Sequence, residues 1–201
     1  SPFPPSPNAV KKAEEVLNSL QLYPDPECRE LTQMIADNLG VDYGEVLVTN
    51  GSDEILNFAF MAYGDEGMPI VFPDITYGFY PVFAQLSNIP YEEIPLDDEF
   101  KIRLSDYIGI NKTIVIANPN APTGLALSFE DVEKIISSNP DNIVIMDEAY
   151  MAFCGESCME LVNKYSNLLV VRTFSKSHSL AGLRVGFGIA SKEIIEDLNK
   201  L

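Results

Sequence analysis

The feature that most constrains the fold is a repeated pairing of a short apolar run with a longer amphipathic segment. Such runs occupy residues 45–49, 68–72, 113–117 and 142–146, and each leads through a turn into the next segment. The run at 113–117 is continuous and largely β-branched, as expected for a strand that is covered on both faces. This alternation predicts an α/β protein in which helices cover a mostly parallel sheet.

The other segments follow the same rhythm. Strands are also expected at residues 89–94, 168–172 and 184–190. Helices are expected at residues 8–19, 27–39, 52–63 and 129–137, near 159–165, in a segment that ends near residue 86, and in a segment that begins at residue 191. Prolines crowd residues 1–7 and forbid regular structure there, so an extended arm is expected. We divide the chain into an arm and helix at 1–22 and one large domain at 23–201.

Charge and cysteine content exclude several classes of protein. Among 201 residues, 13 are basic and 30 acidic, and the net charge of −17 disfavours nucleic acid or an anionic membrane as a partner. The apolar runs are too short for a membrane span and the start lacks the layout of a signal peptide, so we expect a cytoplasmic protein. Cys28, Cys154 and Cys158 lack the companions of a disulfide framework or metal site, and we expect reduced thiols and no metal.

A glycine turn follows the first expected strand. The segment Asn50-Gly51-Ser52-Asp53-Glu54 joins that strand to a helix start. The amides of a first helical turn point outward, so the segment predicts an anion site. Alternatively, Ser52 or Asp53 caps the helix and does nothing else.

Polar and aromatic residues also follow three later strands. Asp147 ends a buried run, where an unpaired carboxylate is costly, so it either faces a cation such as a protonated pyridine nitrogen or caps the next turn. Tyr77 and Tyr150 either contact a planar ligand or pack in the core. The proline-rich loop 118–124 is rigid, and it lies where open α/β sheets bind ligands.

A lysine lies among hydroxyls and small residues in the segment 173–184. An amine that reacts with an aldehyde must be held in place, and Lys176 directly follows Ser175 after an apolar strand. Arg184 is a candidate phosphate ligand, and His178 is expected to pack against the loop. A solvated surface lysine is the alternative. With the anion turn and Asp147, these residues fit a phosphorylated, planar aldehyde, which is pyridoxal 5'-phosphate.

The whole set of motifs resembles the fold-type I pyridoxal-phosphate aminotransferases, and within them the histidinol-phosphate aminotransferases. The resemblance covers nearly the entire chain. Its segments are Tyr23–Pro26, Asn50–Glu54, Asn118–Gly124, Asp147–Tyr150 and Arg172–Arg184. It implies a three-layer αβα fold with a mostly parallel sheet of about seven strands, and a small domain that lies outside this chain.

The resemblance also implies a role for each matching residue. Lys176 would form a Schiff base with the cofactor and later move a proton, while Asp147 would keep the ring nitrogen protonated. Tyr77 would stack on the ring, and Tyr150 would hydrogen-bond its hydroxyl oxygen. The phosphate ligands that the resemblance implies are Gly51, Ser52, Asp53, Ser175, Arg184 and, across a homodimer interface, Tyr23.

Two positions depart from the family pattern. Ala121 replaces an asparagine that should touch the ring hydroxyl, and the neighbouring Asn120 is the candidate substitute. Phe3 stands where a tyrosine is common, so it could line the substrate pocket but has no hydroxyl to donate. The arginine that binds the substrate carboxylate is expected beyond residue 201.

The function implied is transfer of an amino group between L-histidinol phosphate and 2-oxoglutarate in histidine biosynthesis. Because part of the substrate site is expected outside this chain, we expect the isolated 201 residues to transaminate poorly. The alternatives are an aromatic aminotransferase, a threonine-phosphate decarboxylase, or a non-catalytic binding module of the same fold.

Overall fold

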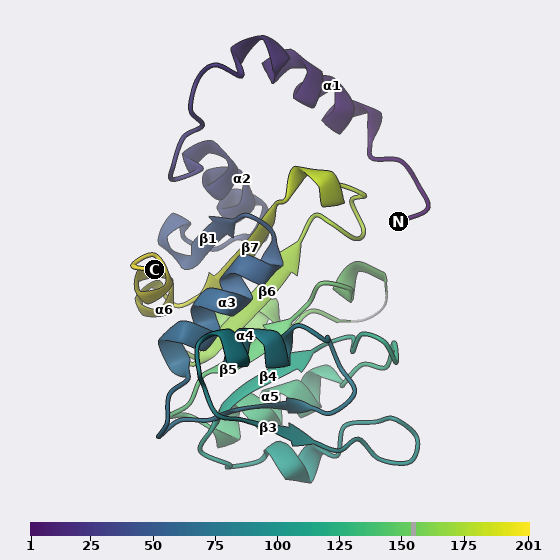
Figure 1. Ribbon diagram of the computed structural model, residues 1–201, viewed down its shortest axis with the longest axis vertical. Helices are drawn as coiled ribbons and strands as arrows, with labels where there is room; N and C mark the ends of the chain where they lie inside the picture. The colour runs from purple at the N-terminus through teal and green to yellow at the C-terminus, as the bar shows by residue number, and fades with distance from the viewer. Residues whose placement is uncertain (154–155) are drawn as a thin grey trace.

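The computed structural model describes residues 1–153 and 156–201, and it contains a seven-stranded sheet (Figure 1). The strands are β1 (Val46–Thr49), β2 (Ile70–Pro73), β3 (Tyr91–Ile94), β4 (Thr113–Ala117), β5 (Val144–Asp147), β6 (Leu168–Thr173) and β7 (Gly186–Ala190). Their order is β1-β7-β6-β5-β4-β2-β3. Strand β7 runs antiparallel to both of its neighbours, β1 and β6, and the other neighbouring strands pair in parallel, so the expected mostly parallel sheet is confirmed.

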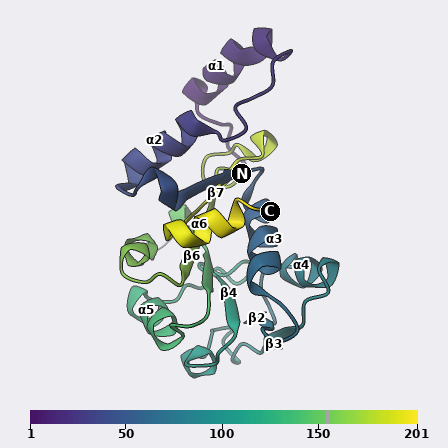
Figure 2. The same cartoon turned by 90° about the vertical axis from the view of Figure 1, so that its left-hand side faces the viewer.

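Helices cover both faces of the sheet. The helices that pack on it are α2 (Arg29–Leu39), α3 (Ser52–Tyr63), α4 (Tyr80–Leu86), α5 (Phe129–Ser138) and α6 (Lys192–Leu198), whereas α1 (Pro7–Val16) contributes no buried residue. Figure 2 shows α5 on one side of the sheet and α3 with α4 on the other. No helix among residues 1–153 and 156–201 is long and apolar enough to cross a membrane.

Alternate residues of each central strand supply the two halves of the core. In β4, Ile114 and Ile116 pack in the cluster that contains residues of α2 and α5, whereas Val115 and Ala117 pack in the cluster with α3, α4 and α6. All five residues of β4 are buried. A strand buried on both faces needs no polar alternation, which explains why the apolar runs predicted these strands well.

The segments 159–165 and 184–190 differ from the elements expected there. The segment expected as a helix at 159–165 is only a 3-10 helix at Met159–Asn163. The last strand was expected from Arg184 but begins at Gly186, because Arg184 adopts a left-handed conformation (φ 55°) after the 3-10 turn Ala181–Leu183. That conformation interrupts the extended backbone that a strand requires.

The N-terminal region lies apart from the sheet. Helix α1 contributes no buried residue, and Figure 1 shows it standing away from the body of the molecule. Tyr23 is fully exposed, and Phe3 is also exposed. The division at residue 22 agrees with this separation but stays a prediction.

Two of the three cysteines, Cys28 and Cys158, lie within the described residues, and both are free thiols. Cys158 is buried, and burial raises the pKa of its thiol above the ordinary value. A buried, protonated thiol is a poor metal ligand. Cys154 lies outside the described residues.

Candidate active site

A pocket of about 140 Å³ opens where the carboxyl ends of the parallel strands meet the start of β7. Most of the residues expected to bind a cofactor contribute to its wall. The lining residues are Ser52, Asp53, Tyr77, Ala117, Ala121, Asp147, Ala149, Tyr150, Thr173, Ser175, Lys176, Ala181 and Arg184. They come from segments far apart in the sequence, which the parallel topology gathers at one edge of the sheet.

One end of the pocket is built by the first turn of α3. Gly51 is the N-cap residue, so Ser52 and Asp53 lie inside the helix and no side chain caps it. The alternative that Ser52 or Asp53 serves as the cap is therefore wrong. Gly51 has φ 84°, and a Cβ there would lie 2.5 Å from Nη2 of Arg184. The helix start and the arginine thus form a close cradle that favours an anion.

This cradle depends on a second close approach between backbones. A Cβ on Gly186 would lie 2.3 Å from the amide nitrogen of Ser52 and 2.5 Å from the carbonyl carbon of Gly51. Backbone atoms cannot move aside as a side-chain tip can. Position 186 therefore requires glycine for β7 to pack against the start of α3.

Replacing Gly186 with alanine is expected to destabilise the fold by about 1–3 kcal/mol, the range typical of overpacking. The melting temperature and the denaturant midpoint measure the loss. Gly182→Ala is the matched control, because its Cβ would meet nothing within 4 Å. Equal stability of the two variants would contradict this close approach.

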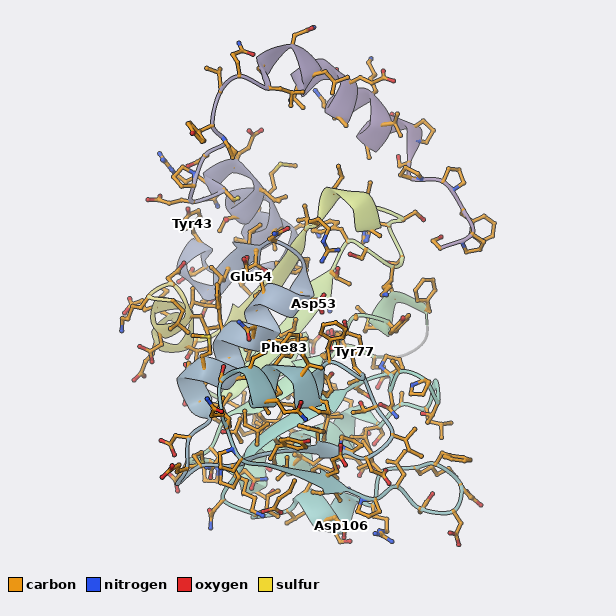
Figure 3. All side chains as sticks on the ribbon, in the orientation of Figure 1. Tyr43, Asp53, Glu54, Tyr77, Phe83 and Asp106 are labelled. Atoms are coloured by element: carbon orange, nitrogen blue, oxygen red, sulfur yellow. The ribbon has the colours of Figure 1, made fainter. Side chains whose placement is uncertain are left out.

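Asp53 and Tyr77 interact directly at the pocket wall (Figure 3). The Tyr77 hydroxyl donates to Oδ1 of Asp53 at 2.9 Å, and Nη2 of Arg184 lies 3.8 Å from Oδ2. Burial first, and then the hydrogen bond to Asp53, raise the pKa of Tyr77 well above its usual value. The hydroxyl therefore stays protonated as a donor, and the Asp53 side chain orients both Tyr77 and Arg184.

Asp147 supplies a buried carboxylate to the pocket. It is only 5% exposed, and it accepts hydrogen bonds from the Tyr80 hydroxyl (2.9 Å) and the Ala149 amide (3.1 Å). Burial raises its pKa to about 6, although both hydrogen bonds oppose that rise. It forms no ion pair with another described residue. A buried carboxylate without a cation fits a ligand that carries a protonated nitrogen.

Lys176 reaches the same pocket from the loop after β6. Its Nζ lies 5.2 Å from the centre of the Tyr150 ring. Thr173 fixes the loop by accepting a hydrogen bond from the Ser175 amide at 3.1 Å. His178 lies outside this pocket and packs against Phe174, with ring centres 4.9 Å apart, as expected.

Two expected site residues lie elsewhere. The Asn120 side chain donates to the Ile75 carbonyl (2.9 Å) and accepts from the Thr76 hydroxyl (2.8 Å), so it holds the loop before Tyr77. Ala121, and not Asn120, lines the pocket. Tyr23 is fully exposed and is not part of the pocket wall.

A buried ion pair that was not predicted from the sequence lies beside the pocket. The Glu148 side chain is fully buried and pairs with Arg172, whose Nη2 lies 2.9 Å and Nε 3.0 Å from Oε2. Glu148 also accepts from the Cys158 amide at 2.7 Å. The sequence contains a signal for this pair, since Asp147 and Glu148 are adjacent acidic residues at the end of a buried strand. Each buried carboxylate needs its own partner, so a basic residue on a neighbouring strand could have been expected.

The fold with this pocket defines the class of protein. A histidinol-phosphate aminotransferase from Sinorhizobium meliloti, solved in complex with pyridoxal-5'-phosphate, superposes with a TM-score of 0.93 over 99% of this chain and 56% of its own, at 23% identity. The enzyme of that name from Clostridium acetobutylicum gives a TM-score of 0.88 at 25% identity, over 98% of this chain and 60% of its own. The fold is that of the pyridoxal-phosphate-dependent transferases.

The family follows from sequence. The model for aminotransferase class I and II matches residues 1–201, and the chain belongs to that family. A histidinol-phosphate aminotransferase from Acinetobacter baumannii (strain AYE) is 48% identical over 98% of this chain. The histidinol-phosphate aminotransferase 1 of Hydrogenovibrio crunogenus is 50% identical over the whole chain. The chain spans 56% and 57% of the length of these two relatives.

Proposed function

We propose that this chain is the cofactor-binding part of a pyridoxal-phosphate-dependent histidinol-phosphate aminotransferase. The observation that carries the proposal is the buried Asp147 carboxylate, which has no cation partner among the described residues and shares a pocket with Lys176. The anion cradle at Ser52 and Arg184 completes the set that a phosphorylated pyridine aldehyde needs. The relatives at 48–50% identity support the choice of reaction.

Three residues have direct chemical roles in this proposal. When bound, pyridoxal phosphate withdraws electrons from the substrate's α-carbon. Lys176 would hold the cofactor through its amine, and it would act as the base that takes the proton from the substrate's α-carbon and passes it to the C4′ carbon of the cofactor. Asp147 holds a proton on the ring nitrogen, and the Tyr150 hydroxyl hydrogen-bonds the ring oxygen.

The remaining pocket residues bind and orient the cofactor. The amides of Ser52 and Asp53, the Ser175 hydroxyl and the Arg184 guanidinium hold its phosphate. Tyr77 packs on the ring face and is kept in position by Asp53. Asn120 supports this arrangement through the backbone before Tyr77, since its amide is already engaged there.

The proposal extends to substrates and assembly. L-histidinol phosphate is the amino donor, as the names of the relatives suggest, and 2-oxoglutarate is the acceptor, which rests on the family resemblance. The protein acts as a cytoplasmic homodimer in which Tyr23 reaches the phosphate of the neighbouring site. Its full exposure leaves Tyr23 free for such a contact.

We expect the full-length protein to take up pyridoxal phosphate and turn yellow. Borohydride should bleach the colour and fix the cofactor on Lys176, which peptide mass spectrometry identifies. Amino transfer from L-histidinol phosphate to 2-oxoglutarate should exceed transfer from aromatic amino acids, and carbon dioxide release from threonine phosphate should be absent. A protein that stays colourless and binds no added pyridoxal phosphate would instead support a non-catalytic binding module.

A further inference from the structure

Tyr80 contacts Asp147 but is not among the residues that line the pocket. It is the first residue of α4 and is completely buried, and its hydroxyl lies 2.9 Å from Oδ2 of Asp147. The rings of Phe60, Phe72 and Tyr77 surround it, with centres 6.3, 5.6 and 5.5 Å away. This packing leaves the hydroxyl little freedom to turn to another partner.

In the hydrogen bond between Tyr80 and Asp147, the Tyr80 hydroxyl is the donor. An ionised carboxylate only accepts, so the Tyr80 hydroxyl must donate. Burial, and then the charge of Asp147, raise the pKa of Tyr80 well above its usual value, so the proton remains on the phenol. The Ala149 amide donates to the other oxygen, Oδ1. Each oxygen of Asp147 therefore has one donor from the protein and keeps lone-pair capacity for a ligand.

The surrounding charges make these donors necessary. Burial and the negative charges of Asp53 and Glu148 all disfavour ionised Asp147. The other titratable or charged groups that line the pocket are Tyr77, Tyr150, Lys176 and Arg184, and none of them hydrogen-bonds or pairs with Asp147 among the described residues. Tyr80 is the sole side-chain donor to Asp147 in the described part of the chain.

We propose that Tyr80 is a positioning residue that keeps the Asp147 carboxylate ionised and aimed into the pocket. The inference rests on the proposed function in one respect, namely that the ligand of the pocket carries a cationic ring nitrogen. Tyr80 does not touch the pocket space itself and acts only through Asp147.

The test removes the hydroxyl alone with Tyr80→Phe. Carbon-13 NMR of labelled aspartate, assigned with Asp147→Asn, follows the Asp147 carboxyl in the cofactor-free protein. In the parent protein we expect titration near a pKa of about 6. Loss of a hydrogen bond to the charged form should displace the midpoint upward by about 1–2 pH units. An unchanged midpoint overturns the inference.

A matched control separates this effect from the loss of any buried hydroxyl. Tyr107 is also buried, and its hydroxyl hydrogen-bonds to none of the described residues, so Tyr107→Phe should leave the Asp147 midpoint unchanged. If Tyr80→Phe fails to fold, the NMR resonances of the Tyr80 ring are followed against pH in the parent protein instead. Their chemical shifts should change at the pH where Asp147 titrates, and unchanged shifts there overturn the inference.

Cofactor affinity gives a second readout. The dissociation constant of pyridoxal phosphate should rise several-fold as Asp147 becomes protonated, and in Tyr80→Phe that rise should begin 1–2 pH units higher, by the same displacement as the titration. Coincident affinity profiles for variant and parent overturn the inference. If the parent protein binds no cofactor, the proposed function fails, while the titration still decides whether Tyr80 keeps Asp147 ionised.

Discussion

Replacing Lys176 with alanine is expected to lower the rate of amino transfer by at least about 10²–10⁴-fold, the contribution of a positioned acid–base group. Loss of the amine would also prevent the proposed covalent bond to the cofactor, so borohydride should fix no cofactor on the protein. The pocket wall otherwise remains, because the start of α3 and Asp147 come from other segments of the chain. We therefore expect the cofactor to bind reversibly and the fold to be unchanged.

Lys134→Ala is the control for that experiment. Lys134 is an exposed lysine on α5 that pairs with Asp131 at 2.9 Å, and it lies outside the pocket. Its replacement should leave turnover and cofactor fixation at the parent level. Cofactor fixed on a Lys176→Ala protein would show that another lysine is the reactive amine and would contradict the proposed site.

Arg172→Ala is expected to cost about 3–5 kcal/mol of unfolding free energy, as is typical when one partner of a buried ion pair is removed. The Glu148 side chain is fully buried, and the variant would leave its charge without the guanidinium. Denaturant titration measures the loss. Arg103→Ala, which breaks an exposed pair with Asp106, should change stability little.

A second replacement tests the cause of that loss. Glu148→Gln removes the buried charge while its amide oxygen can still accept from the Cys158 amide. Arg172→Ala combined with Glu148→Gln should therefore be more stable than Arg172→Ala alone. A double variant that is no more stable would mean that lost packing of Arg172, and not an unpaired charge, causes the effect.

The sequence was most informative where the chain's own periodicity decides the structure. The residues expected in the strand 113–117 form β4 with the same bounds. The helix expected at 129–137 is α5, and Ser128 caps it by accepting from the Asp131 amide at 3.2 Å. Such features depend on neighbours within a few residues, so a single sequence contains the signal.

The sequence was least informative about side-chain direction. Asn120 and Ala121 are adjacent, yet only Ala121 faces the pocket, because hydrogen bonds to residues 75 and 76 hold the Asn120 amide elsewhere. Asp147 and Glu148 are also adjacent, and one lines the pocket while the other pairs with Arg172 on the neighbouring strand. The directions of these adjacent side chains cannot be read from their positions in the sequence, because they depend on which segments are neighbours in the fold.

The amino-acid sequence by itself determined the α/β class, the positions of the central strands and the candidate residues at their ends. These follow from local patterns of apolar residues and turn residues. Only the tertiary structure showed that β7 runs antiparallel, that Gly186 lies against the start of α3, and that Tyr80 donates to Asp147. Those contacts join residues far apart in the chain, and sheet order and packing decide them.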